Sequence, residues 1–131
     1  MRRLTYVFIT LLALVACGEK LTVEQQAAEA ALKYYNRIME GYTDGFASAH
    51  VGFDSLPDDY RQQLLKAHEL YVKDIREKHG GLRQVSVSEN AGYQDTVQHV
   101  VYAFLMLSFK DSTQEQITVP MVQYQGEWMM K

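Results

Sequence analysis

Four side chains in this sequence have the chemistry and the positions to line a small-molecule pocket: Tyr34, Tyr71, His99 and Tyr102. His99 opens the longest apolar stretch and shares strand parity with Val101, so its imidazole could act there as an acid or a base. The plainer interpretation, which we favour, is a ring at a strand end that is hydrogen-bonded or exposed. The tyrosines could point their hydroxyl groups into the same pocket, but packing in the core is their usual role.

The sequence disfavours catalysis by a carboxylate in such a pocket. A general base of this kind must be desolvated to reach a working pKa. The stretch Thr96–Phe109 contains no Asp or Glu, and Glu89 and Glu115 fall at the ends of predicted strands, where carboxylates are ordinarily solvated. We therefore name no catalytic residue and favour a non-catalytic protein.

The sequence predicts no metal or cofactor site. His68 and His79 are eleven residues apart on one helix face, a separation of about 16 Å that is too long for one ion. His68-Glu69 lacks the second histidine that a zinc-protease helix requires. The chain has no phosphate loop, dinucleotide fingerprint or nucleophile elbow.

The N-terminus predicts export and lipid attachment. Met1-Arg2-Arg3 and the apolar run Leu4–Val15 have the cationic start and apolar middle of a secretory signal. Leu14-Val15-Ala16-Cys17 resembles a bacterial lipobox, in which the cysteine receives a diacylglycerol. We expect residues 1–16 to be a signal peptide and 17–21 a lipidated tether, with the protein anchored in the bacterial cell envelope at the outer membrane. The alternative is an ordinary cleaved signal with an incidental cysteine.

Length and charge narrow the set of partners. Removal of the first 16 of 131 residues leaves 115, the size of one domain. Without Arg2 and Arg3 the chain has 11 basic and 16 acidic residues, a net charge of −5. No run of Lys or Arg is present, so we expect no nucleic-acid partner. Membrane contact should come through the lipid on Cys17, because an anionic body is repelled by anionic lipid.

A helix over residues 22–40 is predicted at the start of the domain. Thr22 with Gln25 has the spacing of a capping box. Apolar residues then recur every three or four positions, and Gly41 ends the pattern. A short helix around Asp44–His50 is a weaker prediction.

A second long helix is predicted to run to about His79. Ser55 with Asp58 is its expected capping box, with Pro57 tolerated near the first turn. Gly80-Gly81 stops it. Its apolar stripe consists of Tyr60, Leu64, Ala67, Tyr71 and Ile75.

After Gly81 the apolar period changes to two, which predicts strands. They span residues 82–89, 96–110, 114–124 and 127–131. Turns are indicated at Asn90-Ala91-Gly92, Asp111-Ser112-Thr113 and Gln125-Gly126. Helices followed by a strand meander predict an α+β domain over residues 22–131, with the N-terminal helices packed on a curved, mostly antiparallel four-stranded sheet.

The longest predicted strand is apolar on both faces from Val100 to Leu107. A strand with one solvated face would alternate apolar and polar residues. Either both faces are covered within the chain, or the face away from the helices meets a second copy. We favour a sheet-to-sheet homodimer, because a large bare apolar patch is a liability for a secreted monomer. Pro120 predicts an edge position or a bulge, and Trp128 is expected to pack rather than lie exposed.

With these elements in place, the sequence resembles the nuclear-transport-factor-2-like superfamily, a cystatin-like cone that includes ketosteroid isomerases and polyketide cyclases. The resemblance spans about residues 22–131. It rests on Tyr34-Tyr35, the Gly41–Gly45 break, and Val119-Pro120-Met121-Val122 followed by Gly126-Glu127-Trp128. The closer likeness is to the lumazine-binding-like lipoprotein domains of Bacteroidetes, whose function is unknown. It implies a pocket between sheet and helices and dimerisation through the sheet, and it names no activity.

Three functions agree with this sequence. We favour a lipid-anchored, non-catalytic binding or interaction domain of the envelope, with a small-molecule ligand or a protein partner of unknown identity. The second hypothesis is a small isomerase- or cyclase-like enzyme with His99 and Tyr102 in its pocket. The third is an inhibitor of an envelope enzyme, which the cystatin-like topology suggests.

Overall fold

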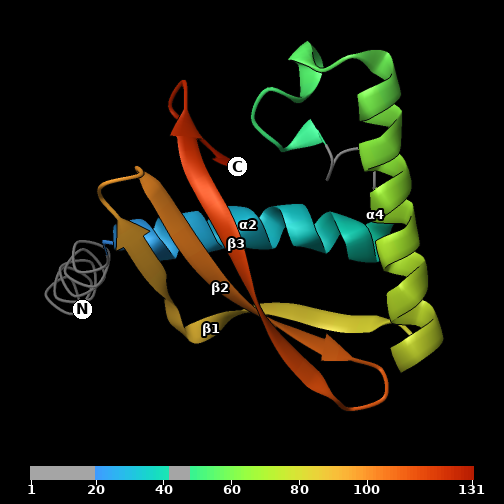
Figure 1. Ribbon diagram of the computed structural model, residues 1–131. Helices are drawn as coiled ribbons and strands as arrows, with labels where there is room; N and C mark the ends of the chain where they lie inside the picture. The colour runs from blue at the N-terminus through green and yellow to red at the C-terminus, as the bar shows by residue number, and fades with distance from the viewer. Residues whose placement is uncertain (1–19, 42–47) are drawn as a thin grey trace, which may run out of the picture.

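The computed structural model of the protein describes residues 20–41 and 48–131. Along the chain lie helix α2 (Val23–Glu40), the 3-10 turn η1 (Phe53–Ser55), helix α4 (Asp58–His79) and strands β1 (Leu82–Asp95), β2 (Val100–Phe109), β3 (Gln114–Tyr124) and β4 (Glu127–Met130). The predicted signal peptide, Cys17 and most of the helix predicted around Asp44–His50 lie outside the described residues. In Figure 1, α2 runs across one face of the sheet and α4 stands at its side. The predicted α+β architecture is confirmed.

Helix α2 lies close against the sheet. The predicted capping box starts it: the Thr22 N–H donates to Gln25 Oε1 at 2.9 Å, and the Gln25 N–H donates to Thr22 Oγ1 at 3.1 Å. Ala27, Ala28 and Ala31 are completely buried. Because alanine side chains are short, the helix backbone can approach β1 and β2 closely, and most helix–sheet contacts of the described residues are made here.

Helix α4 has the predicted length but starts without the predicted capping box. Pro57 is its N-cap and makes no side-chain cap hydrogen bond. Ser55 cannot cap the helix because it ends η1, and extended backbone at Leu56 separates it from the first turn. Asp58 forms an ion pair with Arg61 instead.

Helix α4 also packs more loosely than α2. Of its residues, Ile75 is the one that is fully buried, whereas Tyr60 and Leu70 are each 52% exposed. It meets the sheet mainly through β1. Gly80 ends the helix as predicted, in a left-handed conformation with φ of 77°, and its N–H donates to the Arg76 carbonyl at 3.0 Å. Neither described helix is long and apolar enough to cross a membrane.

The four strands form one antiparallel sheet in the order β1-β2-β3-β4. The predicted turns between β2 and β3 and between β3 and β4 are confirmed. The turn predicted at Asn90-Ala91-Gly92 is wrong. Strand β1 continues to Asp95 through a register shift between Val87 and Gly92, and the chain reverses over residues 96–99.

Gly92 explains this difference. Its φ is +144°, and a Cβ at this position would lie 2.0 Å from the carbonyl oxygen of Tyr102. Glycine therefore allows β1 to pass close to β2, where any other residue would collide. The Asn90 carboxamide accepts the Gly92 N–H at 3.2 Å. The turn-forming residues thus shape a bulge within one strand rather than a reversal.

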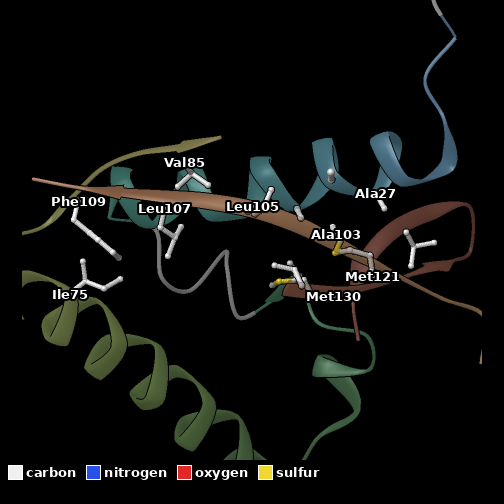
Figure 2. Packing of buried hydrophobic residues seen from close by; sticks show 14 residues of the cluster. Ala27, Ile75, Val85, Ala103, Leu105, Leu107, Phe109, Met121 and Met130 are labelled. Atoms are coloured by element: carbon white, nitrogen blue, oxygen red, sulfur yellow. The ribbon is translucent and has the colours of Figure 1, made fainter. Parts of the chain in front are cut away.

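The hydrophobic core lies between α2 and the inner face of the sheet, as Figure 2 shows. Alternate residues of β2 are buried on this face: Val101, Ala103, Leu105, Leu107 and Phe109. Met121 of β3 and Met130 of β4 complete it, and Ile75 brings α4 against its edge. The apolar residues of β2 that face α2 are therefore covered within the chain.

The outer face of the sheet carries apolar side chains that the described residues leave partly open to solvent. Tyr93 is 53% exposed and stacks on Tyr102, with ring centroids 4.9 Å apart. Phe104 and Met106 are half-buried beside them. Tyr102, Phe104 and Met106 are among the outward-facing apolar residues of β2, which are predicted to meet a second copy of the chain.

Pro120 lies in β3 opposite Tyr102 of β2. Its carbonyl oxygen accepts the Lys131 N–H at 2.9 Å. Because the N–H and C=O of one residue face the same neighbour in an antiparallel ladder, the missing N–H of Pro120 faces the end of β4 rather than β2. Strand β3 lies between β2 and β4, and its pairing with β2 has no register shift, so the predicted edge position or bulge is wrong. The sheet tolerates the proline because its missing N–H faces Lys131, past the end of β4.

Candidate functional site

The four residues predicted to share a pocket lie in three parts of the molecule. Tyr102 is on the outer face of the sheet, stacked with Tyr93. Tyr71 is on α4 and is 37% exposed. Tyr34 and His99 each line a hollow that also includes Trp128. His99 faces the inner side, so the structure does not bring it together with Tyr102 as the isomerase-like hypothesis requires.

The hollow beside His99, which we call the Trp128 pocket, lies at the N-terminal end of α2. Its volume is about 300 Å³, at the lower end of the range for small-molecule sites. Helix α2, all four strands and the turn between β1 and β2 contribute to it. Its lining residues are Val23, Gln26, Gln94, His99, Val101, Gln123 and Trp128.

Trp128 is held in place by both the sheet and α2. It pairs with Gln123 across the last hairpin, and its half-buried side chain packs against the core as predicted. The Tyr34 hydroxyl donates to the Trp128 carbonyl oxygen at 2.5 Å. Burial raises the pKa of Tyr34, and the nearby Glu127 carboxylate raises it further, so at neutral pH this hydroxyl keeps the proton that it donates.

His99 reaches the pocket from a left-handed backbone conformation, with φ of 58°. This region favours glycine, and a side chain there costs free energy. The preceding turn is held by Asp95, whose Oδ1 accepts the N–H groups of Val97 and Gln98, both at 3.0 Å. Ser112 and Gln125 adopt the same conformation in the other two hairpin turns, so at His99 it is the geometry of the turn that places the imidazole beside the pocket.

The lining of the Trp128 pocket is uncharged. Gln26, Gln94 and Gln123 each carry a carbonyl acceptor and an NH₂ donor, and Gln26 uses one N–H on the Leu21 carbonyl at 3.2 Å. Among the described residues that line it there is no Asp, Glu, Lys or Arg. These groups suit recognition of a neutral polar ligand, and they include no carboxylate that could remove a proton.

The three glutamines were missed by sequence reasoning. Gln123 shares strand parity with buried Met121 and lies near the strand end, so an inward-facing amide beside Trp128 was a signal that the sequence contained. Gln94 had no such signal. Its pairing with Val101 depends on the register that β1 adopts after the Gly92 bulge.

A second hollow, of about 510 Å³, meets the Trp128 pocket at Gln26 and Trp128. Unlike the Trp128 pocket, it carries charged side chains. Its other lining residues are Leu21, Glu29, Ala30, Lys33, Tyr34 and Glu127. Because the two hollows share two residues, a ligand longer than the first one could continue into the second.

A separate set of titratable side chains joins α4 to the rest of the protein. The ring centroids of His68 on α4 and His50 are 5.8 Å apart. Burial lowers the pKa of both, and His50 lowers that of His68 further, to about 4. Burial raises the pKa of Tyr71, as does Glu115, and burial followed by Tyr71 raises that of Tyr35. These four rings are therefore uncharged at neutral pH, as half-buried groups at a helix–body contact should be.

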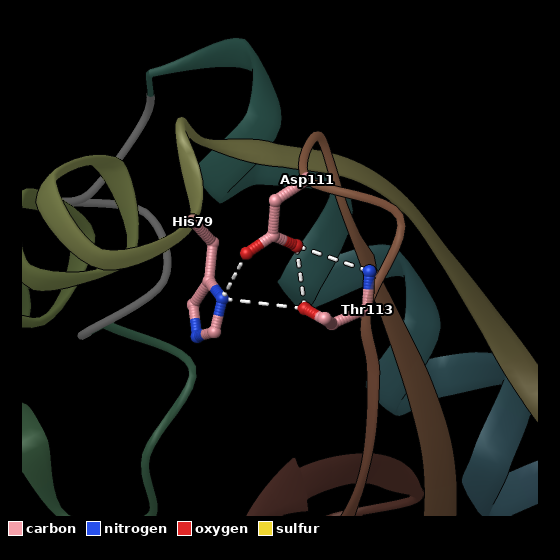
Figure 3. Close-up of polar contacts among 3 residues, drawn as sticks. All are labelled: His79, Asp111 and Thr113. Carbon is pink, nitrogen blue, oxygen red and sulfur yellow. Dashed lines mark hydrogen bonds and ion pairs between the residues drawn. The ribbon is translucent and has the colours of Figure 1, made fainter.

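The C-terminal end of α4 is fastened by His79, Asp111 and Thr113, which Figure 3 shows. His79 Nδ1 lies 2.8 Å from Asp111 Oδ2 and 3.3 Å from Thr113 Oγ1, and the Thr113 hydroxyl donates to Asp111 Oδ1. The three residue types match a hydrolase triad, but the geometry does not. In a triad the hydroxyl and the carboxylate bind opposite ring nitrogens, whereas here both approach Nδ1. The cluster thus ties α4 to the β2–β3 turn.

Within residues 20–41 and 48–131, no three His, Cys, Asp or Glu side chains are grouped so that they could hold a metal ion. Among the described residues, we take the Trp128 pocket as the candidate site, because its lining combines amide, imidazole and indole side chains.

Comparison with known proteins identifies the fold. No protein-family model matches the sequence, and no curated protein does. Among solved structures, the chain is similar to an NTF2-like candidate transpeptidase from Campylobacter jejuni, with a TM-score of 0.54 and 13% sequence identity over 78% of this chain and 94% of that one. At this identity the likeness concerns the fold alone. The protein thus has the α+β fold of the nuclear-transport-factor-2-like (NTF2-like) proteins.

Proposed function

We propose that the protein is a non-catalytic binding domain of the bacterial envelope, anchored by a lipid on Cys17, with the Trp128 pocket as its ligand site. The observation that carries the proposal is the lining of this pocket, where three side-chain amides, an imidazole and an indole converge without a charged group. Such a lining provides donors and acceptors for recognition. It lacks the desolvated carboxylate of an isomerase-type base.

The place of the pocket along the chain supports a membrane-proximal role. Val23 lines the pocket and is six residues from Cys17. Six residues span at most about 20 Å when fully extended. A lipid on Cys17 would therefore hold the pocket near the bilayer surface, where a ligand of the envelope would meet it.

The outer face of the sheet supports a homodimer as part of the same proposal. Tyr93, Tyr102, Phe104 and Met106 form a patch of partly exposed apolar side chains, and contiguous patches of this kind mark interaction sites. A closer kinship with the lumazine-binding-like lipoprotein domains of Bacteroidetes is likewise proposed on the sequence resemblance.

The anchor is tested by Cys17→Ala in a bacterial host. We expect the wild-type protein to carry a lipid mass and to fractionate with the outer membrane. The variant should lack the lipid and lose membrane attachment. A variant that stays membrane-bound to the same extent would contradict the anchor.

The ligand site is tested by native mass spectrometry of the full chain purified in mild detergent. We expect a reproducible small-molecule mass on the wild-type protein and its loss from Gln94→Leu. Gln84→Leu is the matched control, because Gln84 is exposed on the same strand and does not line the pocket. A bound mass that survives Gln94→Leu would place the ligand elsewhere.

A further inference from the structure

We infer that the Trp128 pocket binds a neutral, hydroxyl-rich ligand, namely a short oligosaccharide. This inference rests on the proposed binding function and names the ligand class of the same site. It draws on three observations: the charge of the pocket lining, the combination of amides with apolar side chains, and a second hollow that shares two lining residues with the pocket.

The lining residues select against ions. Apart from the imidazole of His99, the described side chains that line the Trp128 pocket carry no ionisable group. Five of the seven lining residues are exposed, so a phosphate, carboxylate or ammonium group would keep part of its water there. It would, however, meet no Asp, Glu, Lys or Arg of the lining that could attract it. A ligand without ionised groups needs no such partner.

The amides can form the same kinds of hydrogen bond that a hydroxyl group forms. A hydroxyl both donates and accepts, and so does each carboxamide of Gln26, Gln94 and Gln123. The three amides come from α2, β1 and β3, so they approach the pocket from different sides. A ring with several hydroxyl groups along its rim can use all three at once.

Apart from His99, the remaining lining is apolar. Val23, Val101 and the indole of Trp128 supply it. A sugar ring carries hydroxyl groups on its rim and C–H groups on its faces, so it presents polar edges and an apolar face together. The combination of amides and an indole in one pocket therefore fits a sugar better than it fits a purely apolar or a purely polar molecule.

The second hollow indicates a ligand longer than one ring. It shares Gln26 and Trp128 with the pocket and has a volume of about 510 Å³. Its charged residues are of both signs, Lys33 against Glu29 and Glu127. A chain of sugar units that continued past Trp128 would thus meet both positive and negative side chains rather than charges of one sign.

An extended peptide fits these observations less well. Peptides that dock on a sheet commonly pair with a free strand edge. Of the two edge strands, β1 and β4, β4 is the one that carries Trp128, and it is already bonded at Met130. The Val51 N–H donates to the Met130 carbonyl at 2.9 Å, and the Met130 N–H donates to the Ala49 carbonyl at 3.1 Å. Little of the four-residue strand is left to pair with another chain.

The test uses the single tryptophan of the chain as its reporter. Detergent-solubilised full-length protein is titrated with maltotriose, with N,N′,N″-triacetylchitotriose, with an N-acetylated, C-amidated trialanine and with inorganic phosphate, while Trp128 emission is recorded. We expect a saturable change with at least one trisaccharide and none with phosphate. Gln123→Leu should weaken that binding by about tenfold, because a ligand hydroxyl would lose its partner.

Gln116→Leu is the matched control, since Gln116 is exposed on the same strand opposite Met106 and does not line the pocket. It should bind the sugar as the wild-type protein does. Saturable binding of trialanine alone would overturn the ligand class and leave the binding function standing. Sugar binding that Gln123→Leu does not weaken would overturn the assignment to this pocket. A response to no probe in the millimolar range would also overturn the ligand class, and the native mass measurement would then decide the binding function separately.

Discussion

Helices α2 and α4 carry similar apolar stripes in the sequence, yet they are attached to the protein in different ways. Helix α2 buries three alanines completely against the sheet, so its backbone is part of the core. Helix α4 buries Ile75 and leaves Tyr60 and Leu70 half-exposed. Besides Ile75, α4 is held by two further side-chain contacts, His50 with His68 and His79 with Asp111.

This contrast shows that the largest shifts in pKa and the candidate binding site lie in different parts of the molecule. The largest described shifts are those of Tyr35 on α2 and His68 on α4, two rings near the contact between α4 and the rest of the protein, and shifts of this kind often mark active sites. Here the shifts follow from burial where a helix is attached. The Trp128 pocket lies at the start of α2, the firmly packed helix, and its lining contains no Asp, Glu, Lys or Arg. A rigid support is what a preorganised binding site needs.

The contrast in packing predicts the largest effect. Ala28→Leu in α2 should destabilise the protein by about 2 kcal/mol or more, because the larger side chain has no space against the sheet. Ala67→Leu, at an exposed position of α4, should change stability by less than about 0.5 kcal/mol. Urea unfolding of the two variants measures both. Equal losses would mean that α4 is packed as tightly as α2.

The attachment of α4 predicts a smaller effect that depends on pH. The folded pKa of His68 is about 4, against 6.5 when unperturbed, so between these values the unfolded chain binds more protons than the folded one. Stability should therefore be constant above pH 6.5 and fall as pH decreases toward 4. We expect a loss of about 1 kcal/mol, well below the full equivalent of the shift because the half-exposed ring is screened by solvent.

Urea unfolding at several pH values tests this, with His68→Gln as the variant that should reduce the slope below pH 6.5 and leave the part that His50 contributes. An unchanged slope in His68→Gln would assign the pH dependence to other groups. Asp111 acts in a separate range. Thr113 and His79 hold its pKa at about 2, against 3.8 when unperturbed, so its contribution is present above pH 3.8 and is lost as pH falls through 2.

The smallest effect on stability is expected at the Trp128 pocket. His99→Gly removes a side chain from a left-handed position, which relieves strain but gives the unfolded chain more freedom. Stability should therefore stay within about 0.5 kcal/mol of the wild type, while ligand affinity falls. Gln125→Gly, at φ of 52° in the last hairpin and outside the pocket lining, should leave both unchanged. If affinity is unchanged in His99→Gly, the ring does not contact the ligand.

Much of the fold could be predicted because its signals are local. The Thr22–Gln25 capping box, the glycine stop after His79 and the period-two strands each act over a few residues. Strand β1 could not be followed past Gly92, because the choice between a turn and a bulge depends on the backbone of β2, which lies ten residues further along the chain. Ser55 likewise has the residue type and spacing of a helix N-cap, but in the structure it is the last residue of η1.

The candidate site was predicted in part. Tyr34 and His99 were named, and the packing of Trp128 was expected. A pocket that combines Tyr71 and Tyr102 with them was not formed, because an apolar stripe on a helix does not say how closely the helix approaches the sheet. Gln94 could not be predicted, because its inward position depends on how β1 pairs with β2 after the bulge at Gly92.

The hydrogen bond from Tyr34 to Trp128 joins residues that are 94 positions apart. The strands of the sheet pair in chain order, so each hairpin closes over a short loop, whereas this contact closes nearly the whole domain. Loop closure over such a distance is slow compared with hairpin formation. During synthesis α2 is made well before β4, and the Trp128 pocket can form only after both are present. Ligand binding is therefore a property of the finished fold, and we expect it to appear last during refolding, after the hairpins have formed.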